Sequence, residues 1–345
     1  MSKLTPFKEA VYSISEKSGA AGMLQSLGGF TGAQVYVLAY HRVDLPEHRP
    51  WLNPELINAS PAQFRAQMEL VARNYHPVGI EDVLNAAEGG KKLPRNAVVV
   101  TVDDGYLDFQ ETILPICRQH GIRPLLFTPT AYVGEGTFWW DMLYQMVYFS
   151  GWPQISAQGT GPLRILTAEE KQSALNHLSH LIKQSALEKD HNWLDTLYRE
   201  FLDQARHGFV KDRCDTLDWD ELREASRNGA DIAAHTHTHP IVSRISDEQV
   251  RQEIRQCRSL LRSELNSDYP VFAYPDGLAA DITPDNRRIV REEGFQLAFT
   301  MIGRRAELDH DPHDYLPRLG TWSKLSLGHF HLRLTPLFSR IQTQR

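Results

Sequence analysis

The stretch VVVTVDDGY, residues 98–106, carries the strongest fold signal in this chain of 345 residues. It is an apolar run of strand length that passes directly into two carboxylates and a glycine. Strands buried on both faces of a parallel sheet read as continuous apolar runs, and ligands in such folds bind at the carboxyl ends of the strands. The stretch therefore predicts a buried parallel strand that ends, at Asp103 and Asp104, in a functional site.

Further apolar runs of strand length lie on both sides of this one, and several alternate with helical patterns. Capping sequences mark helix starts at Ser60, Ser246 and Thr283. This order predicts an α/β domain built by β/α repetition. The further runs occupy residues 35–39, 125–128, 231–234, 271–274 and 297–300.

The β/α rhythm stops between about residues 135 and 220, where a segment rich in Leu, Trp and His intervenes. We interpret this segment as a helical insertion. The aromatic residues at its start, including Trp140, either pack internally or line a substrate groove. The predicted organisation is an N-terminal helical segment at 1–34, a main domain at 35–320 and a C-terminal tail at 321–345.

The charge of the chain gives no electrostatic case for nucleic acid, because a net charge of -6 lacks the usual basic footprint. No apolar run has the pattern of a signal peptide or the length of a membrane span, so we expect a location in the cytoplasm or at the inner face of the membrane. The chain after Trp322 has basic residues and no acidic ones, which fits either a solvated tail or weak attraction to a membrane surface. Those basic residues are Lys324, Arg333, Arg340 and Arg345. The oligomeric state stays open.

A second polar strand end lies at residues 235–239, HTHTH, directly after an apolar run. Imidazole is a common zinc ligand. In a helical turn His235 and His239 would share one side, whereas in an extended chain His237 would join them on one face. Three histidines at one strand end favour a metal site over separate structural roles, and a cation would relieve the repulsion between adjacent carboxylates.

Two more strand ends carry polar groups, namely YHRV at 40–43 and FAYPDG at 272–277. By itself the sequence around Pro275 and Asp276 also fits a simple turn. Four polar strand ends are much harder to explain by chance than one. They predict a single site at one edge of the sheet.

At these residues the sequence resembles the polysaccharide deacetylases of carbohydrate esterase family 4, which share the NodB homology domain. TVDDG at 101–105 resembles the first motif of the family, and HTHTH resembles the second, H-S/T-x-x-H. The motif order, which begins with YHRV, looks like the circularly permuted branch that includes poly-N-acetylglucosamine deacetylases. The resemblance covers residues 35–320 and implies a distorted (β/α)7-type barrel with a helical insertion.

The resemblance also implies a metal site. Asp104, His235 and His239 would bind a divalent cation, most often Zn²⁺, and His237 would remain a neighbour. Zinc held by three protein ligands can lower the pKa of a bound water to about 7, which suits amide hydrolysis at neutral pH.

The same resemblance makes Asp103 the general base and His41 the general acid. The third motif of the family often begins with an arginine that orients the base, whereas Phe272 stands at that place here. Arg42 or Arg318 would have to replace it. Arg318 is our catalytic candidate, although arginine suits a structural ion pair equally well.

The expected reaction is the metal-dependent hydrolysis of an N-acetyl group on an amino sugar, in cell-surface polysaccharide or lipid-linked glycan biosynthesis. A backbone N–H at Tyr106 or Asp276 would hold the oxyanion. Alternatives are a deformylase or other small-amide hydrolase acting on a sugar precursor, and an inactive glycan-binding protein of the same fold. A metal phosphoesterase generally needs more ligands. The predicted substrate contacts are Tyr106, Tyr274, Pro275, Asp276 and Trp140.

Overall fold

The computed structural model describes residues 33–157, 160–184, 192–204 and 215–335. The predicted helical segment at 1–34 therefore lies, apart from its last two residues, outside the described residues. The predicted apolar runs form strands at the expected places. The strands that build the central ring are β1 (Gln34–Tyr40), β5 (Ala97–Asp103), β6 (Leu125–Thr128), β9 (Asp231–Ala234), β10 (Val271–Ala273), β11 (Leu297–Phe299) and β13 (Leu319–Gly320).

The central sheet curls until its two ends meet. Its strands follow the order β11-β10-β9-β6-β5-β1, and every neighbouring pair in this run is parallel. Leu319 in β13 pairs in parallel with β1, while Leu316, just before it, exchanges 2.8 Å backbone hydrogen bonds with Ala298 and Thr300 next to β11. Residues 316–320 thus join both edges and close a ring of seven parallel segments. The expected distorted (β/α)7 barrel is confirmed.

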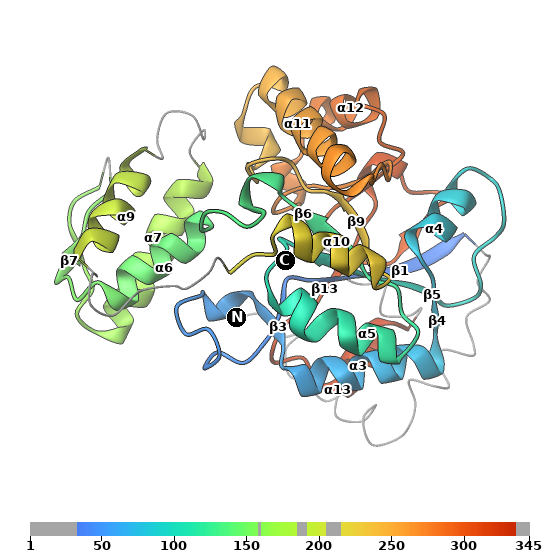
Figure 1. The fold of residues 1–345 in the computed structure, drawn as a ribbon, viewed down its shortest axis with the longest axis horizontal. Helices are drawn as coiled ribbons and strands as arrows, with labels where there is room; N and C mark the ends of the chain where they lie inside the picture. The colour runs from blue at the N-terminus through green and yellow to red at the C-terminus, as the bar shows by residue number, and fades with distance from the viewer. Residues whose placement is uncertain (1–32, 158–159, 185–191, 205–214, 336–345) are drawn as a thin grey trace, which may run out of the picture.

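Side chains of β5 alternate between two hydrophobic layers, as the two-residue period of a strand requires. Val98, Val100 and Val102 pack outward against helices, whereas Ala97 and Val99 belong to the inner cluster. Helices surround the ring in Figure 1. They are α3 (Pro61–Asn74), α5 (Leu114–Gln119), α10 (Trp219–Arg227), α11 (Asp247–Leu265), α12 (Pro284–Glu292) and α13 (Leu327–Arg333), whereas α4 (Ile80–Ala87) lies elsewhere.

Local signals set the helix starts. Ser60, Ser246 and Thr283 each accept a hydrogen bond from the backbone N–H three residues on, in full capping boxes that begin α3, α11 and α12. Helix α4 has a different place, because Ile80 and Val83 pack into the inner cluster. It therefore fills the barrel interior, below the ends of the strands that carry the polar motifs.

The insertion folds as a helical unit with its own hydrophobic cluster, which includes Met146, Leu178 and Phe201. In Figure 1 this unit, drawn in green, stands to one side of the barrel. A short hairpin accompanies its helices. The elements are α6 (Trp139–Phe149), β7 (Gln154–Ile155), β8 (Leu163–Arg164), α7 (Ala168–Gln184) and α9 (Asn192–Gln204).

The predicted C-terminal tail is wrong for residues 321–335. Ser326 caps α13 by accepting a hydrogen bond from the backbone N–H of His329, and Phe330 is buried in the outer core. Arg333 donates to the Gly320 carbonyl and its guanidinium lies 4.7 Å from the centre of the Trp322 ring, so it is no solvated charge. Apolar side chains such as Phe330 dock this short helix against the core, although basic residues lie between them in the sequence. Arg340 and Arg345 lie outside the described residues.

Among the described residues, none of the helices combines the length and the apolar character that crossing a bilayer requires.

Candidate active site

Three side chains converge where β5 and β9 end. Asp104 follows β5, and its backbone N–H donates to the Phe127 carbonyl of β6. The Nε2 atoms of His235 and His239 lie 3.8 and 3.3 Å from Asp104 Oδ1, and one ligand atom from each of the three residues lies within 4.8 Å of the others. Ligands on a tetrahedral zinc, each about 2.0–2.1 Å from the ion, are separated by about 3.3 Å. The spacing fits a shared cation.

The bonding around these three residues also fits a metal. Asp104 Oδ1 is buried and accepts no hydrogen bond from the described residues. His235 Nδ1 lies 2.8 Å from the Ala273 carbonyl, so this nitrogen carries the proton and leaves the Nε2 lone pair directed at Asp104. Histidines that bind metals usually donate their other N–H in this way. The residues present are therefore suited to hold a divalent cation.

The pKa shifts of Asp104, His235 and His239 bear on the same metal site. Burial lowers the pKa of His235 to about 4, despite the nearby carboxylates. Burial alone would lower the pKa of His239 as well, but its interaction with Asp104 raises it above the ordinary value. Burial would raise the pKa of Asp104, yet His239, His41 and His235 together lower it. An ionised carboxylate and a neutral imidazole are the forms that bind metals, so the lowered pKa values of Asp104 and His235 favour their binding forms.

Asp103 lies beside the three residues and pairs with Arg318 instead. Arg318 Nη1 and Nη2 donate to the two Asp103 oxygens at 2.7 and 2.8 Å, and Arg318 Nε donates to the Thr300 carbonyl. Burial alone would raise the pKa of Asp103, but Arg318, His235 and His41 together bring it well below the usual range. Asp103 is thus ionised and fixed in orientation. Of the two candidate arginines, Arg318 is the one that pairs with it.

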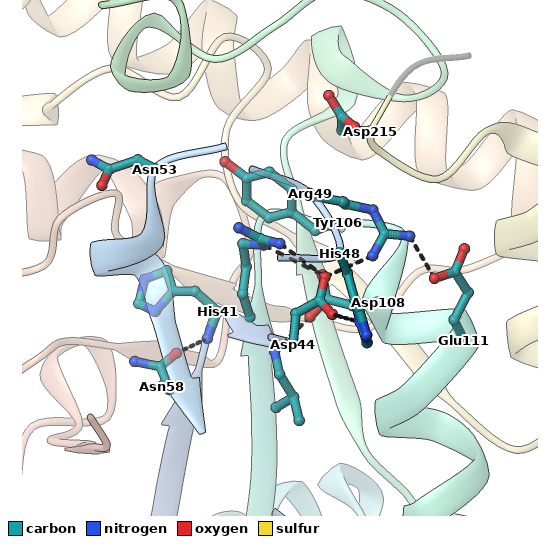
Figure 2. A network of polar contacts seen from close by, with 12 residues as sticks. His41, Asp44, His48, Arg49, Asn53, Asn58, Tyr106, Asp108, Glu111 and Asp215 are labelled. Atoms are coloured by element: carbon teal, nitrogen blue, oxygen red, sulfur yellow. Dashed lines mark hydrogen bonds and ion pairs between the residues drawn. The ribbon is translucent and has the colours of Figure 1, made fainter. Parts of the chain in front are cut away.

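His41 stands at the edge of the site, with 27% of its side chain exposed and its Nε2 3.9 Å from Asp103 Oδ2. Its backbone N–H donates to Asn58 Oδ1, beside it in Figure 2, and Asn58 Nδ2 donates to the Thr321 carbonyl at 2.8 Å. Asn58 therefore ties the chain after β1 to the chain after β13. An imidazole held there is accessible from solvent and close to Asp103.

Arg42 belongs to a separate ionic network, drawn in Figure 2. Its Nη2 donates to Asp44 at 3.1 Å, and its Nε lies 3.6 Å from Asp108. Arg49 bridges Asp44 and Glu111. These contacts fasten the loop that follows His41 to the start of the helix after β5. Arg42 thus pairs with Asp44 and Asp108, whereas Arg318 pairs with Asp103.

Trp140 and Tyr106 form an aromatic wall beside His239. The Trp140 ring lies 5.1 Å from the His239 ring, edge to face, and stacks on Phe138 at 4.5 Å. Trp140 Nε1 donates to the Tyr106 hydroxyl, which itself donates to Asp141. Trp140 thus lies next to the three converging residues, and its role in binding substrate stays a prediction, whereas the buried Tyr106 hydroxyl is fully engaged within the protein.

Unlike the hydroxyl of Tyr106, its backbone N–H makes no hydrogen bond within the described part of the chain. In the turn after β5, Asp104, Gly105 and Leu107 use their N–H groups in backbone hydrogen bonds, and the Tyr106 N–H takes part in none of those made by the described residues. This N–H is the part of Tyr106 that can bind a substrate oxygen.

The strand end at 272–277 is only partly directed at the site. Tyr274 lies in the outer core, with its hydroxyl donating to the Asp314 carbonyl, so the prediction that its side chain contacts substrate is wrong. The alternation along β10 turns it toward the helices. Pro275 is buried. Asp276 has a left-handed backbone, with φ of 55°, and binds Lys183 of α7 at 2.5 Å; its charge contributes to the raised pKa of His239.

His237 faces away from the three converging residues. Its Nδ1 lies 2.9 Å from Thr130 Oγ1, and its Nε2 lies 2.9 Å from Gln256 Nε2. This arrangement agrees with the assignment of His237 as a neighbour. Sequence reasoning missed Asn58, which gave no signal, and Asp141, whose place as an acid inside an aromatic segment was a signal of a buried role.

Comparison with known proteins gives a family. The family model for polysaccharide deacetylase matches residues 90–298. A poly-β-1,6-N-acetyl-D-glucosamine N-deacetylase of Escherichia coli K12 is 34% identical over 98 residues, which are 27% of this chain and 14% of that protein. The alignment thus spans only a small part of that curated relative.

Solved structures share the fold at low sequence identity. The Streptococcus pyogenes deacetylase PplD, in complex with acetate, has a TM-score of 0.58 and 16% identity over 89% of this chain and 100% of that chain. IcaB from Ammonifex degensii has a TM-score of 0.54 and 18% identity over 88% of this chain and 98% of that chain. The segment matched by the family model contains both aspartates and both outer histidines of the site. The chain belongs to the polysaccharide deacetylase family, the NodB-type carbohydrate esterases of family 4.

Proposed function

We propose that the protein is a metal-dependent N-deacetylase that hydrolyses the N-acetyl group of an amino sugar within a glycan. The observation that carries this proposal is the convergence of Asp104, His235 and His239 beside an ionised Asp103 that Arg318 holds in place. Membership of the polysaccharide deacetylase family supports a glycan substrate. The relative named as a poly-β-1,6-N-acetyl-D-glucosamine N-deacetylase favours N-acetylglucosamine as the sugar.

Zn²⁺ is the proposed cation, held by one aspartate and two histidines. When bound, it would supply Lewis acidity toward the acyl oxygen and lower the pKa of a water at the site. No hydrogen bond from the described residues competes for Asp104 Oδ1, which supports its proposed place as a ligand.

Asp103 would accept the proton of the attacking water. Its depressed pKa keeps it ionised at neutral pH, and the two bonds from Arg318 aim its carboxylate. Arg318 is a positioning residue in this scheme, because it contacts the base and lies fully buried.

The two ends of the reacting amide need different partners. The free N–H of Tyr106 would stabilise the negative charge that develops on the acyl oxygen. His41 would donate a proton to the departing amine, which is a poor leaving group otherwise. Its partial exposure lets it regain that proton from solvent after each turnover.

Trp140 and Asp276 are the proposed substrate contacts. Trp140 offers a partly exposed aromatic edge next to His239, a surface on which sugar rings commonly pack. Asp276 offers a carboxylate on the other strand end, where Lys183 of the insertion also reaches. A role in cell-surface polysaccharide or lipid-linked glycan biosynthesis, in the cytoplasm or at the inner face of the membrane, stays a prediction.

The deciding experiment is product analysis with a defined metal content. The purified chain is stripped with a chelator, reloaded with Zn²⁺ and incubated with N-acetylglucosamine oligomers of several linkages and with N-formyl analogues. We expect mass spectrometry to detect loss of acetyl groups, with matching release of acetate, only in the reloaded sample. Release of formate alone would point to a deformylase. No acyl release from any glycan by the metal-loaded protein, or equal release with and without metal, would overturn the proposal.

A further inference from the structure

The loop between the two histidines of the site has an unusual backbone. Thr236 and His239 both adopt left-handed conformations, with φ of 64° and 59°. A β-branched residue rarely takes this conformation, which persists only where the surroundings hold it. Inside the loop, Thr236 Oγ1 accepts from the His239 N–H at 3.1 Å. The Thr236 hydroxyl also donates to the His235 carbonyl, so both of these bonds stay within the loop and its adjoining histidine.

Two backbone bonds, from the N–H groups of Thr130 and Ala131 to the carbonyls of Thr236 and His237, connect the loop to the chain after β6. Glu253 connects it to α11. Its Oε2 accepts hydrogen bonds from the backbone N–H groups of His237 and Thr238, at 2.8 and 2.7 Å. Its Oε1 accepts from the Thr238 hydroxyl at 2.7 Å. Both N–H groups lie between the two histidines that face Asp104. Hydrogen bonds to a carboxylate are about twice as strong as neutral ones, so this side chain grips the loop at its centre.

The helix that carries Glu253 is firmly seated. Its apolar face is buried in the outer core through Val250, Ile254, Cys257 and Leu261. Gln256, on the same helix, reaches the His237 ring. Within the described part of the chain, Glu253 forms no ion pair with a lysine, arginine or histidine, so its charge is directed at the loop.

We infer that Glu253 is a positioning residue for the metal site. It fixes the turn at 236–239 so that His235 and His239 present their Nε2 atoms to the point that Asp104 Oδ1 also faces. Among the described residues, Glu253 contacts the loop and not the side-chain atoms of Asp104, His235 and His239 that face one another, and it does not contact Asp103. The inference rests on the proposed function, because its effect is exerted on the metal ligands.

Metal binding by the stripped protein tests this directly, without substrate. Glu253→Ala, Glu253→Gln and the control Glu248→Ala, an exposed glutamate of the same helix, are titrated with Co²⁺, whose visible spectrum reports ligand geometry, and with Zn²⁺ against a chromophoric chelator. We expect Glu253→Ala to weaken metal affinity by about 10–100-fold and to alter the Co²⁺ spectrum. Glu253→Gln keeps an acceptor without the charge and should lose about 3–10-fold. Glu248→Ala should match the unaltered protein.

Circular dichroism of the stripped proteins shows whether each variant is folded. Unchanged affinity and an unchanged Co²⁺ spectrum in folded Glu253→Ala would overturn the inference and leave the proposed function intact. If Glu253→Ala does not fold, folded Glu253→Gln decides by the same criterion. A stripped, unaltered protein that binds neither metal would overturn both the inference and the metal-dependent function.

Discussion

Arg318 and Asp103 lie 215 positions apart in the chain and form a two-bonded ion pair, at 2.7 and 2.8 Å, from which solvent is excluded. Asp103 ends β5, the strand with the clearest signal in the sequence, whereas Arg318 comes from the short segment that closes the barrel. The pair therefore joins a strand that the local sequence identifies to a segment whose place depends on the whole fold. Its geometry decides how the proposed base is aimed.

Replacing Arg318 should affect stability and turnover together. Arg318→Met leaves a buried carboxylate without a partner and should cost about 3–5 kcal/mol of unfolding free energy. Arg318→Lys keeps the charge but cannot make two parallel bonds, so turnover should fall more than stability. Urea unfolding of the metal-free proteins and acetate release measure the two effects. Wild-type values of both for Arg318→Lys would contradict the assigned role.

The stability cost of Arg318→Met should depend on pH in a defined direction. The pKa of Asp103 is depressed in the folded protein, so its contribution is complete above the unfolded-state pKa of about 4 and declines as the pH falls below that value. The difference in unfolding free energy between the unaltered and Arg318→Met proteins should therefore shrink in acid. A difference that grows as the pH falls would have the wrong sign.

Asp103→Asn should keep the metal and lose turnover. The amide has nearly the shape of the carboxylate but cannot accept the proton of water, so kcat should drop by about 10²–10⁴-fold. Metal analysis of the purified variant and acetate release give both values. Substantial turnover by a variant with full metal content would remove Asp103 from its role as base.

His235→Ala should abolish stoichiometric metal binding, because it removes one of three convergent ligands. The matched control is His237→Ala, which alters a neighbouring imidazole that faces Thr130 and Gln256. Elemental analysis after zinc loading should give about one ion per chain for the control. Equal metal content in both variants would show that the cation is held elsewhere.

Asn58→Ala should lower kcat while metal content stays unchanged. The change releases the backbone of His41 from its only tie to the segment after β13 among the hydrogen bonds of the described residues. The loss should be smaller than that of His41→Ala, which removes the proposed acid and should cost about 10²–10⁴-fold. Acetate release by the two variants at equal metal content checks this, and an Asn58→Ala loss as large as that of His41→Ala would contradict the assignment.

Phe330→Ala should destabilise the whole domain, because the side chain is buried in the outer core. Large-to-small changes at such aromatic positions cost about 3–5 kcal/mol. Leu327→Ala, in the same helix but 43% exposed, should stay within about 0.5 kcal/mol. Denaturant midpoints measure both. A small effect at Phe330 would restore the idea of a detachable tail.

Local signals in the sequence were sufficient for much of the fold. The apolar runs predicted β5, β6 and β9 closely, since strands buried on both faces need little else to identify them. The capping boxes located helix starts for the same reason. The closing strand β13 has only two residues and no apolar run. Its pairing depends on where the rest of the ring lies, which no local pattern encodes.

The site residues also fall into those that a local motif identifies and those that only the folded chain identifies. The two aspartates and the outer histidines belong to short motifs, so the sequence named them together. The choice between Arg42 and Arg318 could not be made in this way, because each arginine meets its carboxylates only after the chain has folded. Tyr274 was misplaced for a simpler reason: the strand alternation that puts Ala273 inward puts the next side chain outward.

Because residues 316–320 both complete the ring and carry Arg318, the partner of Asp103 reaches its place only when the ring closes. Until that segment docks, the later half of β1 and the outer edge of β11 lack their parallel partner, and two neighbouring acids share one pocket without their arginine. A partly folded chain thus lacks the bonds from Arg318 that orient Asp103 in the proposed route. The proposed activity therefore depends on the same segment that completes the tertiary structure.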